Sequence, residues 1–254
     1  MTHTHRRSKR AGTPLSLRLF RWSRSVVLCL VWTALTEANA TGQPLTMLNP
    51  RDILATEPAM FAQLLETARP TPVSAAAKAR ILSFLPPEGE VTNLNASGRR
   101  KLAALSQMLR ATKRDSVYEI KVVDVPLARI GLYERTVVLI SKTALILLDA
   151  DELQALMAHE IGHEYLWVEH ERASRRGDHG RLKELELLCD GIAILTLQGL
   201  GLDPSRLIAG VEKITRYNQQ VFATAVNESG YPPLAERREF GRAVRAWLRA
   251  ADKH

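Results

Sequence analysis

The sequence contains little cysteine and few aromatic residues. Two of its 254 residues are cysteines, and Phe, Trp and Tyr together make up 6%. Cys29 lies in an amino-terminal segment that we interpret as a signal peptide, so Cys189 would remain alone without an intrachain partner. Beyond that segment there are no internal repeats, and no apolar run reaches the roughly 20 residues that a membrane-spanning helix needs. A disulfide scaffold, a repeat protein and a polytopic membrane protein are therefore excluded.

Residues 1–40 have the organisation of a secretory signal peptide. Seven basic residues precede an apolar core of ten residues, Val26–Leu35, and Ala38-Asn39-Ala40 fits a cleavage site of the small-x-small type. An apolar core of this length is too short to span a bilayer. We expect export to the periplasm or the medium, with a mature chain that begins at Thr41. An uncleaved amino-terminal membrane anchor is the alternative.

The positive charge of the chain is concentrated in the same segment. The whole sequence has 35 basic and 27 acidic residues, a net charge of +8. Residues 1–40 hold seven basic residues and one acid, which leaves 28 basic and 26 acidic residues, or +2, for residues 41–254. A nearly balanced charge gives no support to nucleic-acid binding. The length of the mature chain suits a single domain.

His159-Glu160-Ile161-Gly162-His163 is the most informative pattern in the chain. Positions four apart lie above one another on a helix, so the two imidazoles can bind one zinc ion. Glu160 then projects beside the open coordination position, where it can act as general base on the attacking water. Asp149 and Glu152 form a capping-box pattern at the start of the predicted helix. Gly162 leaves room for another element to pack closely.

A catalytic zinc ion usually has a third protein ligand. A metzincin would have a glycine where Leu166 stands and a third histidine beyond it, but His170 falls one residue too far along. Downstream, Glu186 and Asp190 share a helix face, so one carboxylate can bind the metal while the other accepts the free N–H of a ligating histidine. We assign these roles to Glu186 and Asp190 in that order, and expect Glu184 to be solvated.

The remaining pattern predicts an α+β fold that is mainly helical, with a small β-sheet before the motif helix. Residues 41–115 are expected to form a helical segment and residues 116–254 a zincin-like catalytic region, together one compact domain. An edge strand of the sheet could pair with an extended peptide, although strands that only pack on helices fit the composition equally well. Helices are predicted at 51–68, 74–84, 97–112, 205–225 and 233–251, and strands at 117–125 and 135–141, joined by a loop at 126–134.

These patterns resemble a known group of enzymes. Ala158–His163, preceded by Asp151-Glu152-Leu153, is similar to the active-site helix of the gluzincin family that contains the CAAX prenyl proteases and the HtpX-like peptidases. The family's Glu-x-x-Ala-Asp stretch is matched by Glu186–Asp190, with Cys189 in the alanine place. We expect Cys189 to be a small buried residue beside the site; a role as ligand is the alternative.

A later His-Pro…Arg segment of that family resembles Tyr231–Arg237, with Tyr231 in the histidine place. The resemblance implies that Tyr231 and Arg237 steady the substrate carbonyl and the oxyanion, and a phenol can donate the necessary hydrogen bond. Leu127–Arg135 departs from the family's Asn-Ala…Pro-Gly-Gly stretch. This departure affects the residues expected to contact substrate.

The resulting prediction is an exported zinc metalloendopeptidase of the cell envelope, in protein quality control, with one zinc ion per chain. His159, His163 and Glu186 would be the ligands, Glu160 the general base, Asp190 the orienting carboxylate, and Tyr231 or Arg237 the oxyanion support. The expected partner is a protein or peptide substrate, and peripheral membrane association and oligomeric state stay open. The alternatives are a non-catalytic, zinc-containing envelope assembly or chaperone-like protein and a hydrolase of non-peptide amides.

Overall fold

The computed structural model describes residues 48–85, 89–222 and 230–251. The predicted signal peptide and its predicted cleavage site lie outside these residues. The described part has the predicted α+β fold, mainly helical with one small sheet, so the fold class is confirmed. Its helices are α1 Pro50–Ala55, α2 Pro58–Thr67, α3 Ala75–Phe84, α4 Ala96–Ala111, α5 Lys142–Leu147, α6 Ala150–Arg176, α7 His179–Gly199, α8 Ser205–Phe222 and α9 Leu234–Ala251. Its strands are β1 Glu119–Val123, β2 Ile130–Tyr133 and β3 Val137–Ser141.

The sheet has the strand order β1-β3-β2, with β1 parallel and β2 antiparallel to β3. The prediction of a loop at 126–134 is wrong in part, because this segment contains the edge strand β2. Three residues separate β2 from β3, and the Thr136 N–H donates to the Tyr133 carbonyl across the turn. The two central residues of this turn, Glu134 and Arg135, both have positive φ, 48° and 56°. Such turns usually carry Asn or Gly. The sequence therefore contains no recognisable turn signal between the two strands.

The single helix predicted over residues 51–68 is two helices, α1 and α2. Pro58 occupies the first turn of α2, and Glu57 before it has extended backbone with ψ 141°. The residue before a proline is sterically driven out of the helical region, which explains the break. Ile53 of α1 and Phe61 of α2 are buried in a core cluster with α7 residues such as Ile192. Helix α1 therefore packs on α7, and α2 packs on α9 beside it.

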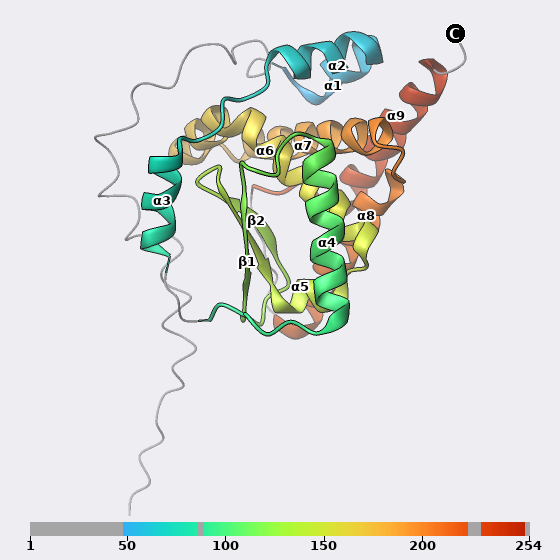
Figure 1. Cartoon of the computed structure of the whole chain (residues 1–254). Helices are drawn as coiled ribbons and strands as arrows, with labels where there is room; N and C mark the ends of the chain where they lie inside the picture. The colour runs from blue at the N-terminus through green and yellow to red at the C-terminus, as the bar shows by residue number, and fades with distance from the viewer. Residues whose placement is uncertain (1–47, 86–88, 223–229, 252–254) are drawn as a thin grey trace, which may run out of the picture. The chain divides into compact units, whose positions relative to one another are not determined.

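Helix α6 is the central element, and it packs against α4, α7, α8 and β2 (Figure 1). It begins with the predicted capping box, in which Asp149 and Glu152 each accept from the other's backbone N–H. It continues without a break to Arg176 and ends at Gly177, whose φ of 65° is the left-handed conformation typical of a helix end. The motif helix thus extends three turns beyond His163, which places later residues of α6 near the same site.

Helices α6 and α7 approach most closely at Gly162. A Cβ atom added to Gly162 would lie 2.9 Å from the Cα atom and 3.1 Å from the carbonyl oxygen of Cys189. These are backbone atoms of α7 and cannot turn aside as a side chain could. The prediction that Gly162 lets another element pack closely is confirmed, and this contact holds the two helices that carry the candidate site together.

A buried ion-pair cluster fixes the opposite side of α6. Glu164 is buried, its carboxylate lies 3.0 Å from Nη1 of Arg114, and it accepts a hydrogen bond from the hydroxyl of Tyr118. Arg114 and Tyr118 lie in the segment between α4 and β1. The cluster therefore couples the helix of the motif to the start of the sheet.

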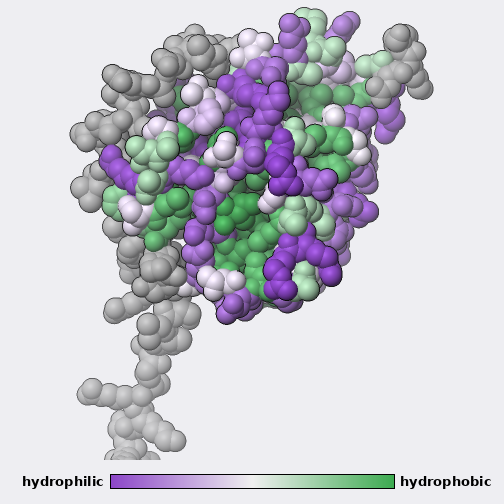
Figure 2. Space-filling model, viewed as in Figure 1, coloured by the Kyte–Doolittle hydropathy of each residue, from purple (hydrophilic) through white to green (hydrophobic). Residues whose placement is uncertain are grey.

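The described surface is largely hydrophilic on the face seen in Figure 2, where a hydrophobic area between β1 and α4 is bordered by hydrophilic residues. Half-buried apolar side chains from several elements pack against the main core, among them Leu102 of α4 and Ile120 of β1. Within the part of the chain that the structure describes, no helix is both long and apolar enough to cross a membrane.

Candidate active site

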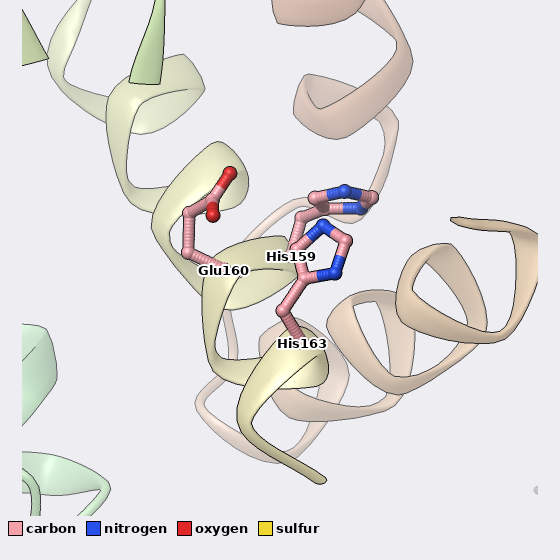
Figure 3. A group of neighbouring side chains, drawn as sticks. All are labelled: His159, Glu160 and His163. Carbon is pink, nitrogen blue, oxygen red and sulfur yellow. The ribbon is translucent and has the colours of Figure 1, made fainter. Parts of the chain in front are cut away.

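Two antiparallel neighbours, α6 and α7, supply most of the candidate site. His159, Glu160 and His163 project from α6, and the two imidazoles lie side by side (Figure 3). Their ring centroids are 4.8 Å apart and their planes are nearly perpendicular. Glu186 and Asp190 project from α7 and are buried, with residue exposures of 2% and 0%. The structure thus brings together five residues that the sequence analysis proposed.

The Glu186 carboxylate faces both imidazoles. His159 Nε2 lies 3.3 Å from Glu186 Oε2, and His163 Nε2 lies 3.5 Å from Glu186 Oε1. Zinc bonds of about 2.1 Å in a tetrahedron require ligand atoms about 3.4 Å apart. Glu186 Oε2 is buried, and within the described residues it has no hydrogen-bond partner. The type, spacing and unsatisfied oxygen of these residues fit a zinc ion.

Two neighbouring groups are less suited to bind metal. Glu184 is exposed and pairs with Arg181 at 2.8 Å on the surface, as expected of a solvated residue. Cys189 is buried with its Sγ 3.5 Å from His163 Nδ1, and burial raises the pKa of its thiol well above the usual value. A thiol kept protonated is a poor zinc ligand. The structure therefore favours Cys189 as a packing residue beside His163.

Asp190 orients His159 as a histidine ligand requires. Its Oδ1 lies 2.8 Å from His159 Nδ1, so the imidazole donates there and turns Nε2 toward Glu186. Burial opposes ionisation of the Asp190 carboxyl, but the Arg237 guanidinium and the hydrogen bond from His159 lower its pKa to about 2. Asp190 is therefore a carboxylate and an acceptor.

Arg237 is the second partner of the Asp190 carboxylate. Its Nε donates to Asp190 Oδ2 at 2.8 Å and its Nη2 donates to Asp190 Oδ1. The residue is buried and comes from the first turn of α9. These contacts are those of a residue that positions Asp190, a partnership that the sequence analysis did not anticipate when it assigned Arg237 to the oxyanion. No sequence spacing links the two residues, because the contact is tertiary.

Glu160 lies between the imidazoles and the edge of the sheet. Its Oε2 accepts a hydrogen bond of 2.7 Å from the backbone N–H of Leu132 in β2. Burial raises the pKa of the Glu160 carboxyl to about 7, although the Leu132 N–H and the charge of His159 oppose this shift. A general base works best with a pKa near the working pH. The position and acidity of Glu160 both suit that role.

A cavity of about 760 Å³ opens over these residues. Its lining includes Glu160, Glu186, the strand β2, Tyr231 and Arg237. Tyr231, the phenol proposed from the sequence as an oxyanion support, is 45% exposed. The described residues that line the cavity all fall between Leu127 and Arg237, so the amino-terminal helices take no part in it.

His170 is the residue at this site that the sequence analysis excluded. Its Nε2 lies 4.0 Å from Glu186 Oε1, and its ring centroid lies 5.3 Å from that of His163. The signal was present in the sequence, since residues seven apart on an unbroken helix share a face. The spacing fails the metzincin pattern, which assumes that the helix ends before the third histidine.

No family model matches the chain, and no curated protein matches it either. The resemblance to gluzincins therefore remains a prediction from the motif residues.

Proposed function

We propose that the protein is a zinc-dependent metalloendopeptidase that hydrolyses peptide bonds in the cell envelope. The observation that carries the proposal is Glu186, a buried carboxylate that faces His159 Nε2 at 3.3 Å and His163 Nε2 at 3.5 Å. Its Oε2 has no hydrogen-bond partner among the described residues. Burying an ionised carboxylate without full compensation is costly, and a bound cation would remove that cost.

Held by His159, His163 and Glu186, zinc would act as a Lewis acid that polarises the scissile carbonyl and lowers the pKa of the attacking water. Glu160 takes the proton from that water and passes it to the leaving amine. The Leu132 N–H holds the Glu160 carboxylate in place at 2.7 Å. A structural zinc site has no need of a further buried carboxylate beside its ligands, which supports the catalytic role of Glu160.

The edge strand β2 is suited to receive an extended peptide. Among the described residues, β3 is its one strand partner, and the N–H of Leu132 reaches Glu160. A peptide paired with this edge would lie along the cavity, with its scissile bond near Glu160. Tyr231, which also lines the cavity, is the proposed hydrogen-bond donor to the oxyanion.

The proposal includes export. Protein isolated from the cell envelope should begin at Thr41, which amino-terminal sequencing can determine. Recovery of chains with an intact amino-terminal segment in the membrane fraction would support the anchor alternative.

Hydrolysis of an unfolded protein such as casein tests the proposed activity. The purified protein should cleave casein, lose this activity when a chelator removes the metal, and regain it when zinc is restored. Chelator-resistant cleavage, or none after zinc is restored, would count against a zinc peptidase.

A further inference from the structure

His170 is a half-buried histidine beside the candidate zinc site that the proposed mechanism does not use. It projects from α6 one turn beyond Trp167, and its side chain is 37% exposed. Both His170 and Trp167 line the cavity. A histidine here is exposed enough to change its side-chain conformation and lies close to two of the proposed ligands, Glu186 and His163.

The length of α6 is what brings His170 to the site. The helix runs unbroken from His163 to Arg176, so two turns separate His163 from His170 on one face. Their rings meet edge to face with centroids 5.3 Å apart. Because α6 continues past His163, His170 stays on the helix face that carries the site.

His170, His163 and Glu186 form a second group of potential ligands, whose ligand atoms all lie within 4.8 Å of one another. His170 Nε2 lies 4.0 Å from Glu186 Oε1, the same oxygen that His163 Nε2 faces at 3.5 Å. Ligands of one tetrahedral zinc ion lie about 3.4 Å apart. A side-chain adjustment of roughly half an ångström would bring His170 to that spacing from Glu186.

We propose that His170 is a fourth protein ligand of the zinc ion, which occupies the coordination position otherwise open to water and leaves it when substrate enters the cavity. The inference rests on the proposed zinc site. If His170 binds, the resting zinc ion has four protein ligands, as in structural zinc sites. When His170 leaves, three protein ligands and one position for water or substrate remain, as in catalytic zinc sites. His170 would then strengthen zinc binding and restrain hydrolysis.

A separate second ion on His163, His170 and Glu186 is the competing arrangement. The Nε2 atom of His163 has one lone pair, so it cannot bind two ions at once. A second ion would therefore have to take His163 from the first. Metal stoichiometry distinguishes the two arrangements.

The test compares His170→Ala with His179→Ala in the full protein. His179 is an exposed histidine at the start of α7, and it does not line the cavity. Zinc affinity is measured by competition with a chelator, and coordination by the visible absorption of the cobalt-substituted protein. His170→Ala should bind zinc at least about tenfold more weakly, change the cobalt spectrum as water replaces nitrogen, and cleave casein faster at saturating zinc. His179→Ala should match the wild type in all three measurements.

Several outcomes would overturn the inference. Unchanged zinc affinity and cobalt spectrum in His170→Ala would remove His170 from the ligands while leaving the proposed zinc site intact. Two zinc ions per wild-type chain, with one lost in the variant, would support the second-ion arrangement instead. Weaker zinc binding without faster hydrolysis would make His170 a permanent ligand and contradict its release by substrate. A wild-type protein that binds no zinc would end both proposals. His170→Asn, a polar replacement, repeats the comparison if the alanine variant unfolds.

Discussion

The Arg237 guanidinium donates to both carboxylate oxygens of Asp190, and Oδ1 of Asp190 also lies 2.8 Å from His159 Nδ1. A chain of charge-assisted contacts thus runs from α9 through α7 to the imidazole on α6. Asp190 is fully buried, so its charge depends on these partners. Arg237 therefore acts on the proposed metal site through Asp190 and His159.

Arg237→Ala should destabilise the protein and weaken zinc binding. It leaves the buried Asp190 carboxylate without its cation, a change that typically costs about 3–5 kcal/mol. Zinc affinity should also fall, by about 10–100-fold, because His159 loses its firm orientation. Urea unfolding measures the first effect and chelator competition the second.

Arg238→Ala is the matched control. Arg238 is the exposed neighbour of Arg237 and pairs with Glu212 on the surface, so its loss should leave the urea midpoint and the zinc affinity nearly unchanged. If Arg237→Ala instead lowered kcat alone, with stability and zinc affinity intact, Arg237 would be an oxyanion donor and its positioning role would be wrong.

Gly162→Ala should separate α6 from α7. The added Cβ would lie 2.9 Å from the Cα of Cys189, so the backbones must move apart, at a cost of about 1–3 kcal/mol. Cys189→Ala in the same chain should give no rescue, because the closest contact is with backbone. Gly199→Ala, whose Cβ would meet no described residue within 4 Å, should be neutral in the same denaturation experiment. Equal stability of the two single variants would show that this close approach is not required.

Glu186→Gln should abolish zinc binding, whereas Glu184→Gln should retain it. Both residues lie on α7, but Glu186 is buried against the imidazoles and Glu184 pairs with Arg181 on the surface. The wild type should hold about one zinc ion per chain by elemental analysis. Equal losses of metal in the two variants would refute the ligand assignment.

Much of the fold could be predicted where local signals act alone. The capping box at Asp149 and the apolar spacing after it predicted α6, and β-branched residues predicted β1 and β3. The edge strand β2 was missed because the Glu134-Arg135 turn adopts positive φ without Asn or Gly. Helix α5 was also missed. It has only six residues, and its N-cap, Ser141, is also the last residue of β3.

Helix periodicity was sufficient to predict those residues of the candidate site that lie on the same helix. The spacing of four residues placed His159 with His163 and Glu186 with Asp190, each pair on one helix face. Arg237 could not be matched to Asp190, since the two residues are 47 positions apart in the sequence and helix α8 lies between their helices. The hydrogen bond from Leu132 to Glu160 was equally hidden, because it depends on how β2 packs on α6.

Glu160→Gln tests the central claim most directly, with zinc content and casein hydrolysis measured on the same preparation. The replacement keeps the shape of the side chain and leaves the proposed ligands unchanged, but it removes the base. The account predicts that the variant holds as much zinc as the wild type and that hydrolysis falls by at least about 10²–10⁴-fold. Undiminished hydrolysis with normal zinc content would contradict the proposed catalytic role of Glu160. If neither protein hydrolysed casein while both held zinc, the non-catalytic envelope protein would become the better account.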